Sequence, residues 1–344
     1  MKLPVLNSPY SQINNLLYKS YLPKIINSAI ETGLFDALSG KSLSLDEVAK
    51  ELNSDAHITD ALLQILVAID FVKKQDDCYS LTVLSEEYLV SNSVVNQLRA
   101  VKMFSKSANP FDDLTQALKG NIKRFDSKLW VSEQTVLAME QSAKAGEIQA
   151  AVSFVKSIPG FHEATKMCDF AGSTGYYSFA LLQENTSLHS HVYDLPEICA
   201  LARKLKYEEE SCDQITYHDF DSSGIGSFGG GYDVFFISRF LYECRTDRSL
   251  LTFLKKVNNS MKPGGLFISS HISSSCANKE SCLTLVIAEL MTRSKGYPTY
   301  MLPVETLKGA LKGAGFGEFT TPQPDEDIAF PAQLLSAKKV KDVE

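Results

Sequence analysis

The spacing of hydrophobic residues changes character along the chain. Between about residues 10 and 91, apolar residues recur at helical spacing in short stretches, and two brief extended runs follow. From about Met167 onward, short apolar runs alternate with stretches of helical periodicity. The first pattern predicts a small helical domain with one hairpin. The second predicts an α/β fold, in which a mostly parallel sheet carries crossover helices.

Two local signals define the expected N-terminal domain. Ser44 and Glu47 match the S-x-x-E capping box, in which both side chains satisfy free amides at the start of a helix. A second helix is expected over residues 58–69, followed by a β-hairpin over 71–81 with a polar Gln-Asp-Asp turn. Helices followed by such a hairpin are typical of a winged helix.

Many winged helices bind DNA, so the candidate recognition helix at residues 57–69 tests that function. It contains no Lys or Arg, although contacts to phosphates need cations and base readout needs polar side chains. The formal net charge of -7 also opposes binding to a phosphate backbone. Because a helix that is apolar nearly all round is buried, we expect this domain to pack against another subunit and not against nucleic acid.

The second half of the chain is expected to hold five strands. They are placed at residues 167–170, 191–193, 215–217, 234–237 and 266–269. A helix between the last two strands ends at the Lys-Pro-Gly-Gly run at 262–265, and an inserted helix is expected over 280–293. The chain is therefore divided into a winged-helix-like dimerisation domain (residues 1–100), a helical linker that contributes to the substrate pocket (101–166) and a Rossmann-like domain (167–340).

A glycine-containing loop follows the first predicted strand of the Rossmann-like domain. Residues 169–175 read Asp-Phe-Ala-Gly-Ser-Thr-Gly and open a helix. Glycines at such a turn let the backbone approach a ligand and present its amides at a helix N-terminus. By itself the motif is equally compatible with a tight turn that binds no ligand.

Acidic residues at the ends of the next two strands favour an adenosine site. Asp194 can accept both ribose hydroxyl hydrogens, and Asp219 can accept the exocyclic amine of adenine beside Phe220, whose ring can stack on the base. NAD is the rival ligand, but this loop offers only Gly172 and Gly175 and lacks the G-x-G-x-x-G fingerprint. Asp169 also suits a cationic amino-acid moiety better than a pyrophosphate.

Composition narrows the setting of the protein. No apolar run approaches the ~20 residues that span a bilayer, and the N-terminus lacks the apolar core of a signal peptide. We therefore expect a soluble, cytoplasmic protein with no membrane partner. The seven cysteines include no C-x-x-C pair, which predicts reduced thiols and no metal site.

Several further motifs extend over nearly the whole chain. They are Gly-Leu-Phe-Asp-Ala-Leu at 33–38, Tyr-Ser-Leu-Thr at 79–82, Asp-Leu-Pro at 194–196, Met-Lys-Pro-Gly-Gly at 261–265 and Gly-Ala-Gly-Phe at 313–316. In these motifs the chain resembles the dimeric O-methyltransferase family, which includes the plant caffeate and acetylserotonin enzymes and bacterial natural-product tailoring methyltransferases. The resemblance implies a class I methyltransferase fold, a homodimer, S-adenosylmethionine as donor and a mostly apolar pocket for a small-molecule acceptor.

Loop positions and strand ends together make up the expected cofactor site. Its residues are Asp169, Gly172, Gly175, Asp194, Leu195, Asp219, Phe220 and Ser238. The family loop usually reads D-x-G-G-G-x-G, whereas Ala171 and Ser173 replace two of those glycines here. These side chains are expected to narrow the loop.

The chain departs from the family at the general base. The family carries L-H-D-W after the fourth strand, with the histidine as base, whereas residues 241–244 here read Leu-Tyr-Glu-Cys. Tyr242 therefore occupies the base position, and a phenol with a pKa near ~10 is a poor base at neutral pH. A bacteriochlorophyll-pathway C-methyltransferase of the family is similar in having tyrosine there. Glu243 is a further polar candidate at the mouth of the site.

A histidine follows the fifth strand, where the family has the glutamate that steadies its base. His271 in this position, with an ordinary pKa near ~6.5, would be a competent base at neutral pH. One hypothesis makes His271 the base and Tyr242 a hydrogen-bond donor or orienting group. The alternative gives His271 no chemical role.

Three functions are compatible with these residues. The leading one is methyl transfer to a small aromatic or polyketide-like acceptor, with O-methylation favoured over N- or C-methylation. The second keeps the fold and donor but uses S-adenosylmethionine for hydroxylation, decarboxylation or a pericyclic step, as in some relatives that lack the histidine base. The third is a catalytically inactive binding protein.

Overall fold

A computed structural model describes most of the chain in two units. The described residues are 7–106, 111–122, 131–205, 212–220, 229–244, 246–273, 279–296, 299, 301–323 and 332–343. The units are Met1–Ala108 and Asn109–Glu344. The finer division into three parts remains a prediction.

The first unit combines short helices with a small antiparallel sheet. Its helices are α1 (Ser11–Lys19), α2 (Leu22–Glu31), α3 (Leu34–Leu38), α4 (Leu45–Glu51), α5 (Ala56–Ala68), α6 (Val83–Tyr88) and α7 (Leu98–Lys106). Its strands β1 (Leu43–Ser44), β2 (Val72–Gln75) and β3 (Cys78–Leu81) are ordered β1-β3-β2. The expected hairpin is confirmed as β2 and β3, and β1 is an addition that its two-residue length hid from the sequence pattern.

The expected capping box and turn are both present. The Ser44 hydroxyl accepts from the Glu47 amide, and a Glu47 carboxylate oxygen accepts from the Ser44 amide at 2.8 Å. In the turn between β2 and β3, Asp76 and Asp77 have φ values of 48° and 61°. Two consecutive left-handed residues give the turn a twist that matches the twist of the strands, and aspartate tolerates this conformation better than most residues.

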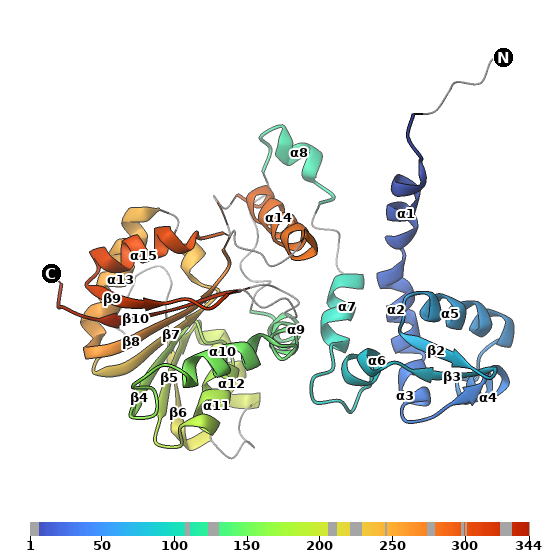
Figure 1. Ribbon diagram of the computed structural model, residues 1–344, viewed down its shortest axis with the longest axis horizontal. Coiled ribbons are helices and arrows are strands. Elements are labelled where there is room, and N and C mark those ends of the chain that lie inside the picture. The colour runs from blue at the N-terminus through green and yellow to red at the C-terminus, as the bar shows by residue number, and fades with distance from the viewer. Residues whose placement is uncertain are drawn as a thin grey trace. The chain divides into compact units, whose positions relative to one another are not determined.

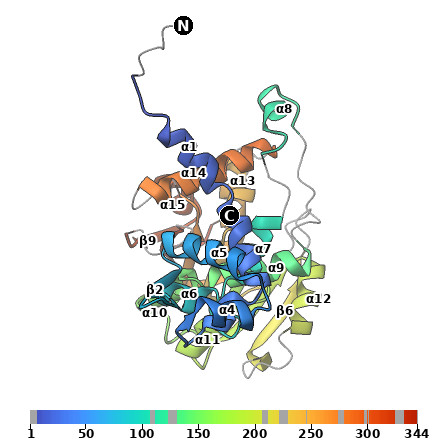
Figure 2. The same ribbon diagram turned by 90° about the vertical axis from the view of Figure 1, so that its right-hand side faces the viewer.

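The helix expected to be buried all round is buried on one side only. Thr59, Leu63 and Leu66 of α5 are buried, whereas Ile58 is 66% exposed. In α1 no residue is buried, and this helix extends away from the body of its unit in both views (Figures 1 and 2). The chain by itself therefore leaves apolar helix surface uncovered.

The second unit is built around a seven-stranded sheet. Its strands are β4 (Lys166–Phe170), β5 (His189–Asp194), β6 (Ile215–Asp219), β7 (Tyr232–Ser238), β8 (Met261–His271), β9 (Phe316–Thr320) and β10 (Gln333–Lys339). The order is β6-β5-β4-β7-β8-β10-β9, and the first five strands are parallel. All five expected strands are confirmed.

Strands β9 and β10 are additions to the predicted sheet. β10 pairs antiparallel with both β8 and β9. Strand β8 also starts earlier than expected, since Tyr232 pairs with Met261 and Val234 pairs with Leu266. Between these two pairs, β8 contains three more residues than β7. The Lys-Pro-Gly-Gly run therefore forms an irregular part of the strand, where Gly264 has a φ of 78°.

Helices cover both faces of this sheet (Figure 1). The helices of this unit are α8 (Leu114–Leu118), α9 (Glu133–Ala143), α10 (Glu147–Lys156), α11 (Tyr176–Glu184), α12 (Pro196–Leu205), α13 (Asp247–Ser260), α14 (Lys279–Ser294) and α15 (Val304–Gly313), with 3-10 turns η2 (Cys212–Gln214) and η3 (Leu241–Glu243). One core packs α10 and α11 against the sheet, and a second core packs α13 and α15 against the other face. This is the expected doubly covered α/β layer.

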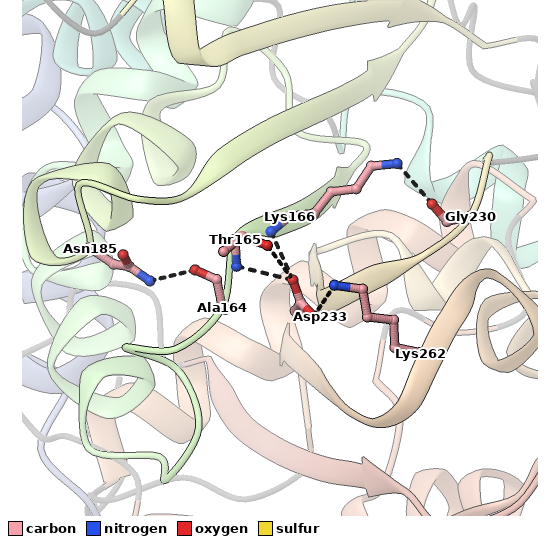
Figure 3. A network of polar contacts seen from close by, with 7 residues as sticks. All are labelled: Ala164, Thr165, Lys166, Asn185, Gly230, Asp233 and Lys262. Atoms are coloured by element: carbon pink, nitrogen blue, oxygen red, sulfur yellow. Dashed lines mark hydrogen bonds and ion pairs between the residues drawn. The ribbon is translucent and has the colours of Figure 1, made fainter.

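Asp233 ties three strands together at the amino-terminal edge of the sheet (Figure 3). One carboxylate oxygen accepts from the Thr165 and Lys166 amides, each at 3.0 Å, and the other pairs with the Lys262 ammonium at 2.6 Å. A cavity of about 360 Å³ lies beside this network. Asp233 and Lys262 neutralise each other there, and Glu163 and Lys338 also line the cavity, so neither sign of charge is in excess.

Two findings bear on the expectations from composition. Cys282 is disulfide-bonded, so the prediction of reduced thiols throughout is wrong at this position. Cys78, Cys168, Cys199 and Cys244 are free. Across the described part of the chain, no helix has the length and apolarity needed to cross a membrane.

Candidate active site

The predicted cofactor loop lies at the carboxyl edge of the parallel strands, between β4 and α11. Asp169 near the end of β4 is only 1% exposed. A Cβ added to Gly172 would lie 2.6 Å from the carboxylate carbon of Asp169. Glycine at 172 is therefore required because the loop backbone packs directly on this buried carboxylate.

Asp169 is held by a pair of buried serines. The Ser178 hydroxyl donates to one carboxylate oxygen at 2.6 Å and contacts the Ser190 hydroxyl at 2.7 Å. The other oxygen, Oδ1, has no hydrogen-bond partner among the residues that the structure describes. Burial raises the pKa of Asp169 to about 7 despite the Ser178 hydrogen bond, and the charge of Asp194 adds to the shift. The sequence pattern missed both serines, because they lie on α11 and β5 and meet Asp169 only in the fold.

Ala171 and Ser173 have φ values of 55° and 54°, in the left-handed region. The two positions where the family usually has glycine therefore keep a glycine-like backbone despite their side chains. Each costs on the order of 1 kcal/mol of strain. The expected narrowing of the loop remains a prediction.

The Asp194 carboxylate at the end of β5 accepts hydrogen bonds from two backbone amides, one in the glycine loop and one directly after β5. It accepts from the Ser173 amide at 2.8 Å and from the Leu195 amide at 2.7 Å. Burial raises the pKa of Asp194 to about 6, although both amides oppose the shift. Through the Ser173 amide, Asp194 joins the glycine loop to β5. Each carboxylate oxygen still has a lone pair that can accept from a ligand hydroxyl, such as those of a ribose.

Asp219 and Phe220 lie beside Asp194 at the end of β6. Asp194 and Asp219 are register partners, and the Phe220 amide donates to the Asp194 carbonyl at 2.7 Å. The exposed Asp219 carboxylate pairs with Arg203 of α12 at 3.2 Å. The Phe220 ring packs edge-on against Phe170, with 4.8 Å between ring centroids. The fold thus brings the three predicted acidic strand ends and Phe220 to one edge.

An ion pair that the sequence did not assign lies where β7 ends. Ser238, a predicted cofactor residue, is hydrogen-bonded to Tyr177. The next residue, Arg239, forms an ion pair with Glu147 at the start of α10, and Glu147 is almost fully buried. Burial raises the pKa of Glu147, and the Arg239 charge opposes that shift. The ion pair fixes α10 to the carboxyl edge beside Ser238.

His271 ends β8 and is 2% exposed. Its Nδ1 is 3.2 Å from the Ser269 hydroxyl, and its Nε2 has no hydrogen-bond partner in the described part of the chain. Burial lowers the pKa of His271 to about 4. The expectation of a histidine that titrates near its ordinary pKa is therefore wrong, because the low-polarity surroundings disfavour the charged ring.

Tyr242 and Glu243 lie in η3, directly after β7. The Arg239 amide donates to the Ser270 carbonyl at 2.8 Å, which fastens the start of this segment to the end of β8. Tyr242 and Glu243 therefore follow β7, and His271 ends the neighbouring strand β8, at the edge where parallel sheets bind ligands. A common cavity for Tyr242 and His271 remains a prediction.

Two family models match the chain. The O-methyltransferase dimerisation domain matches residues 14–91, and the O-methyltransferase domain matches residues 128–315. The second match covers more than half of the chain, including every predicted cofactor and catalytic residue.

Individual proteins are similar at lower identity. An uncharacterised protein of Methanocaldococcus jannaschii is 26% identical over 252 residues, which cover 71% of this chain and 65% of that protein. The N,N-dimethyltransferase OxyT of Streptomyces rimosus is 23% identical over 226 residues, which cover 62% of this chain and 66% of that protein. The chain therefore spans just under two thirds of the length of both relatives.

A solved structure has a similar fold over the full length. Human N-acetylserotonin methyltransferase, solved in complex with S-adenosylmethionine, has a TM-score of 0.76 at 19% identity. The alignment covers 98% of this chain and all of the human one.

Proposed function

The chain belongs to the O-methyltransferase family, and from this premise we propose that it transfers the methyl group of S-adenosylmethionine to a small aromatic or polyketide-like acceptor. Oxygen is the favoured acceptor atom, in keeping with the family model. Nitrogen or an activated carbon is also compatible, and the Streptomyces relative is named as an N,N-dimethyltransferase. The single observation that carries the proposal is the glycine loop packed on Asp169 and bonded to Asp194.

The residues at this edge fit the donor. Asp169 has a buried carboxylate oxygen with no partner in the described ranges, and a cationic amino-acid moiety bound at the loop would stabilise its charge. Gly172 and Gly175 give close access to the backbone. Asp194 would bind the ribose hydroxyls, and Asp219 with Phe220 would bind the adenine. Leu195 and Ser238 would complete the walls of the cofactor site.

When bound, S-adenosylmethionine supplies a methyl group activated by a sulfonium. Transfer is an in-line displacement, so the protein contributes chiefly by aligning the acceptor and excluding water. The aromatic cluster of Phe170, Phe220 and Phe240 provides dry walls beside the site. Because His271 is neutral and weakly basic at pH 7, the site favours an acceptor whose hydroxyl is acidic enough to ionise without a strong base. Tyr242 and Glu243 are the other polar groups proposed to face the acceptor.

A binding measurement tests the donor assignment. Asp194→Ala should weaken S-adenosylmethionine binding by on the order of 1.5–3 kcal/mol, the range for lost hydrogen bonds to a charged group. Isothermal titration calorimetry gives the affinity, and Asp213→Ala, in the short turn before β6, serves as a matched control outside the site. Equal affinities of the two variants would remove Asp194 from the cofactor site. Preferential binding of NAD would overturn the donor assignment itself.

A second candidate function rests on the altered catalytic positions. Tyr242 replaces the family histidine, and burial lowers the pKa of His271 to about 4. A site with no strong base is compatible with an enzyme that uses bound S-adenosylmethionine for hydroxylation, decarboxylation or a pericyclic step. Mass spectrometry with methyl-labelled donor and a panel of small phenols separates the two, since only methyl transfer moves the label to the acceptor.

A further inference from the structure

The Ser269–His271 pair on β8 contains more hydrogen-bonding groups than it has partners. Ser269 is fully buried and His271 is 2% exposed. Among the described residues, each of the two side chains makes one hydrogen bond, and that bond joins them. The Ser269 hydroxyl oxygen lies 3.2 Å from His271 Nδ1. No hydrogen-bond partner of His271 Nε2 lies in the segments that the structure describes.

Only two arrangements of the protons are available to this pair. The buried imidazole is neutral, so one ring nitrogen carries a hydrogen and the other accepts. If Nδ1 donates to Ser269, the serine hydroxyl hydrogen and the Nε2 lone pair are both left unsatisfied. If the serine donates to Nδ1, only the Nε2 hydrogen lacks a partner. Because each unsatisfied buried polar group is costly, the second arrangement is favoured.

We propose that Ser269 holds His271 in the tautomer with hydrogen on Nε2, so that His271 donates a hydrogen bond to an oxygen of the acceptor. The inference rests on the proposed methyl transfer, which it deepens by naming the acceptor class. An N–H donor selects an oxygen that accepts, either a carbonyl next to the reacting group or a hydroxyl that arrives ionised. In this tautomer His271 does not remove the proton of the acceptor, and Ser269 is a positioning residue.

The location of the unsatisfied nitrogen supports a ligand as its partner. His271 stands at the carboxyl end of β8, where open parallel sheets bind their ligands. The hydrogen bond from the Arg239 amide to the Ser270 carbonyl places the residue three positions before Tyr242 beside the same end of the strand. A donor with no partner among the described residues, at such an edge, is suited to a bound oxygen, which would remove the cost of leaving it unsatisfied.

The tautomer can be read without any substrate. In protein labelled with nitrogen-15 in histidine, two-bond proton–nitrogen correlation spectra distinguish a protonated from an unprotonated ring nitrogen. His271→Gln identifies the His271 signals among the six histidines. At pH 7 we expect hydrogen on Nε2 in the wild type and in Ser269→Thr, and a mixture of tautomers in Ser269→Ala. Hydrogen on Nδ1 in the wild type would overturn the proposal.

Two substitutions separate a donor from a base. Gln can place an amide N–H near the position of Nε2 but cannot act as a base, whereas Leu fills the space without a donor. With an acceptor found in the phenol panel, we expect His271→Gln to keep kcat/KM within about tenfold and His271→Leu to lose roughly ten- to a hundredfold. Equal losses of roughly 10²- to 10⁴-fold in both variants would indicate a base and refute the donor role.

Failure of this inference is distinguishable from failure of the proposed function. If S-adenosylmethionine does not bind, the methyltransferase proposal fails while the spectra still report the tautomer. If the donor binds and methyl transfer occurs but the proton lies on Nδ1, only the inference about His271 fails.

Discussion

At the scale of single residues, the cofactor loop combines strained backbone with unsatisfied charge. Ala171 and Ser173 adopt φ values that favour glycine, and the Asp169 carboxylate is buried behind Gly172 with one oxygen unpaired. Both features reduce the stability of the chain without a ligand. Such conflicts between local preference and native conformation concentrate at functional sites.

Removing the strain at Ala171 should stabilise the protein. Ala171→Gly is expected to raise the free energy of unfolding by roughly 0.5–1 kcal/mol, because glycine adopts a φ of 55° without steric penalty. Urea denaturation of the wild type and of Ala171→Gly measures this difference in the free energy of unfolding. Ala180→Gly, the same change inside helix α11, is the control and should lower stability by a similar amount. A loss in both variants would show that the loop position carries no relievable strain.

Asp169 should make stability and cofactor binding depend on pH in opposite directions. Its folded pKa is about 7 against an ordinary value of 3.8, so the folded state binds the proton more tightly. The free energy of unfolding should therefore fall as pH rises from about 4 to 7. S-adenosylmethionine affinity should rise over the upper part of this range, because the cationic donor favours the ionised carboxylate.

The variant Asp169→Asn tests both parts of this prediction. Above about pH 7 it should unfold at higher denaturant concentration than the wild type, and it should lose the pH-dependent gain in affinity. Denaturation at pH 5.5 and 8 gives the stability, and calorimetry at the same two pH values gives the affinity. These pH values lie on either side of the raised pKa of Asp169. Asp112→Asn, at an exposed site, is the control. A wild-type affinity that is constant with pH would contradict the assignment.

At the scale of elements, the end of helix α13 depends on a lysine from a distant strand. Lys339 on β10 is buried, and its ammonium donates to the carbonyls of Asn258 at 2.8 Å and Met261 at 3.0 Å. A cation at the C-terminus of a helix satisfies free carbonyls and opposes the negative end of the helix dipole. The helix of one crossover is thereby fastened to an antiparallel strand of the sheet.

Replacing this lysine should destabilise the second unit. Lys339→Met keeps the length of the side chain but leaves two carbonyls without their donor, and we expect it to lower the free energy of unfolding by about 2 kcal/mol. Chemical denaturation followed by circular dichroism provides the measurement. The adjacent Lys338→Met is the control, because Lys338 is partly exposed and forms a surface ion pair with Glu318 at 3.5 Å. Equal effects of the two changes would show that Lys339 acts as an ordinary surface lysine.

At the scale of the whole molecule, apolar surface is uncovered in the part of the chain that matches a dimerisation domain. Leu16 of α1 is 71% exposed, and Leu17 is 54% exposed. The family model for dimerisation covers residues 14–91 and includes most of α1. Exposed apolar groups concentrated on one helix favour a surface that another chain covers.

We predict that the protein is a homodimer through residues 1 to about 100. Analytical ultracentrifugation at micromolar concentration should give twice the chain mass of 38.0 kDa. Leu16→Asp should shift the protein toward monomer or aggregate, because a charge cannot be buried in an apolar interface without a partner. Leu118→Asp, at an equally exposed leucine of α8, is the control and should leave the mass unchanged. A stable wild-type monomer would contradict the prediction.

The sequence by itself determined the local elements and the positions of the predicted site residues. The capping box at Ser44, the turn at Asp76 and Asp77, and the five parallel strands follow from patterns within a few residues, because backbone preferences and burial periodicity act locally. Asp169, Asp194 and Asp219 could be assigned to one edge because the carboxyl ends of parallel strands converge. Each of these inferences needs only the order of the elements.

The tertiary structure alone decided what surrounds those residues. Strands β9 and β10 were missed because an antiparallel pair at the sheet edge depends on which segment returns beside β8, and no local pattern encodes that. The serines beneath Asp169 and Lys339 at the end of α13 meet partners that lie outside any local sequence motif. The low pKa of His271 has the same origin: its type is read from the sequence, but its burial comes from neighbouring strands, and burial sets the free energy of charging the ring.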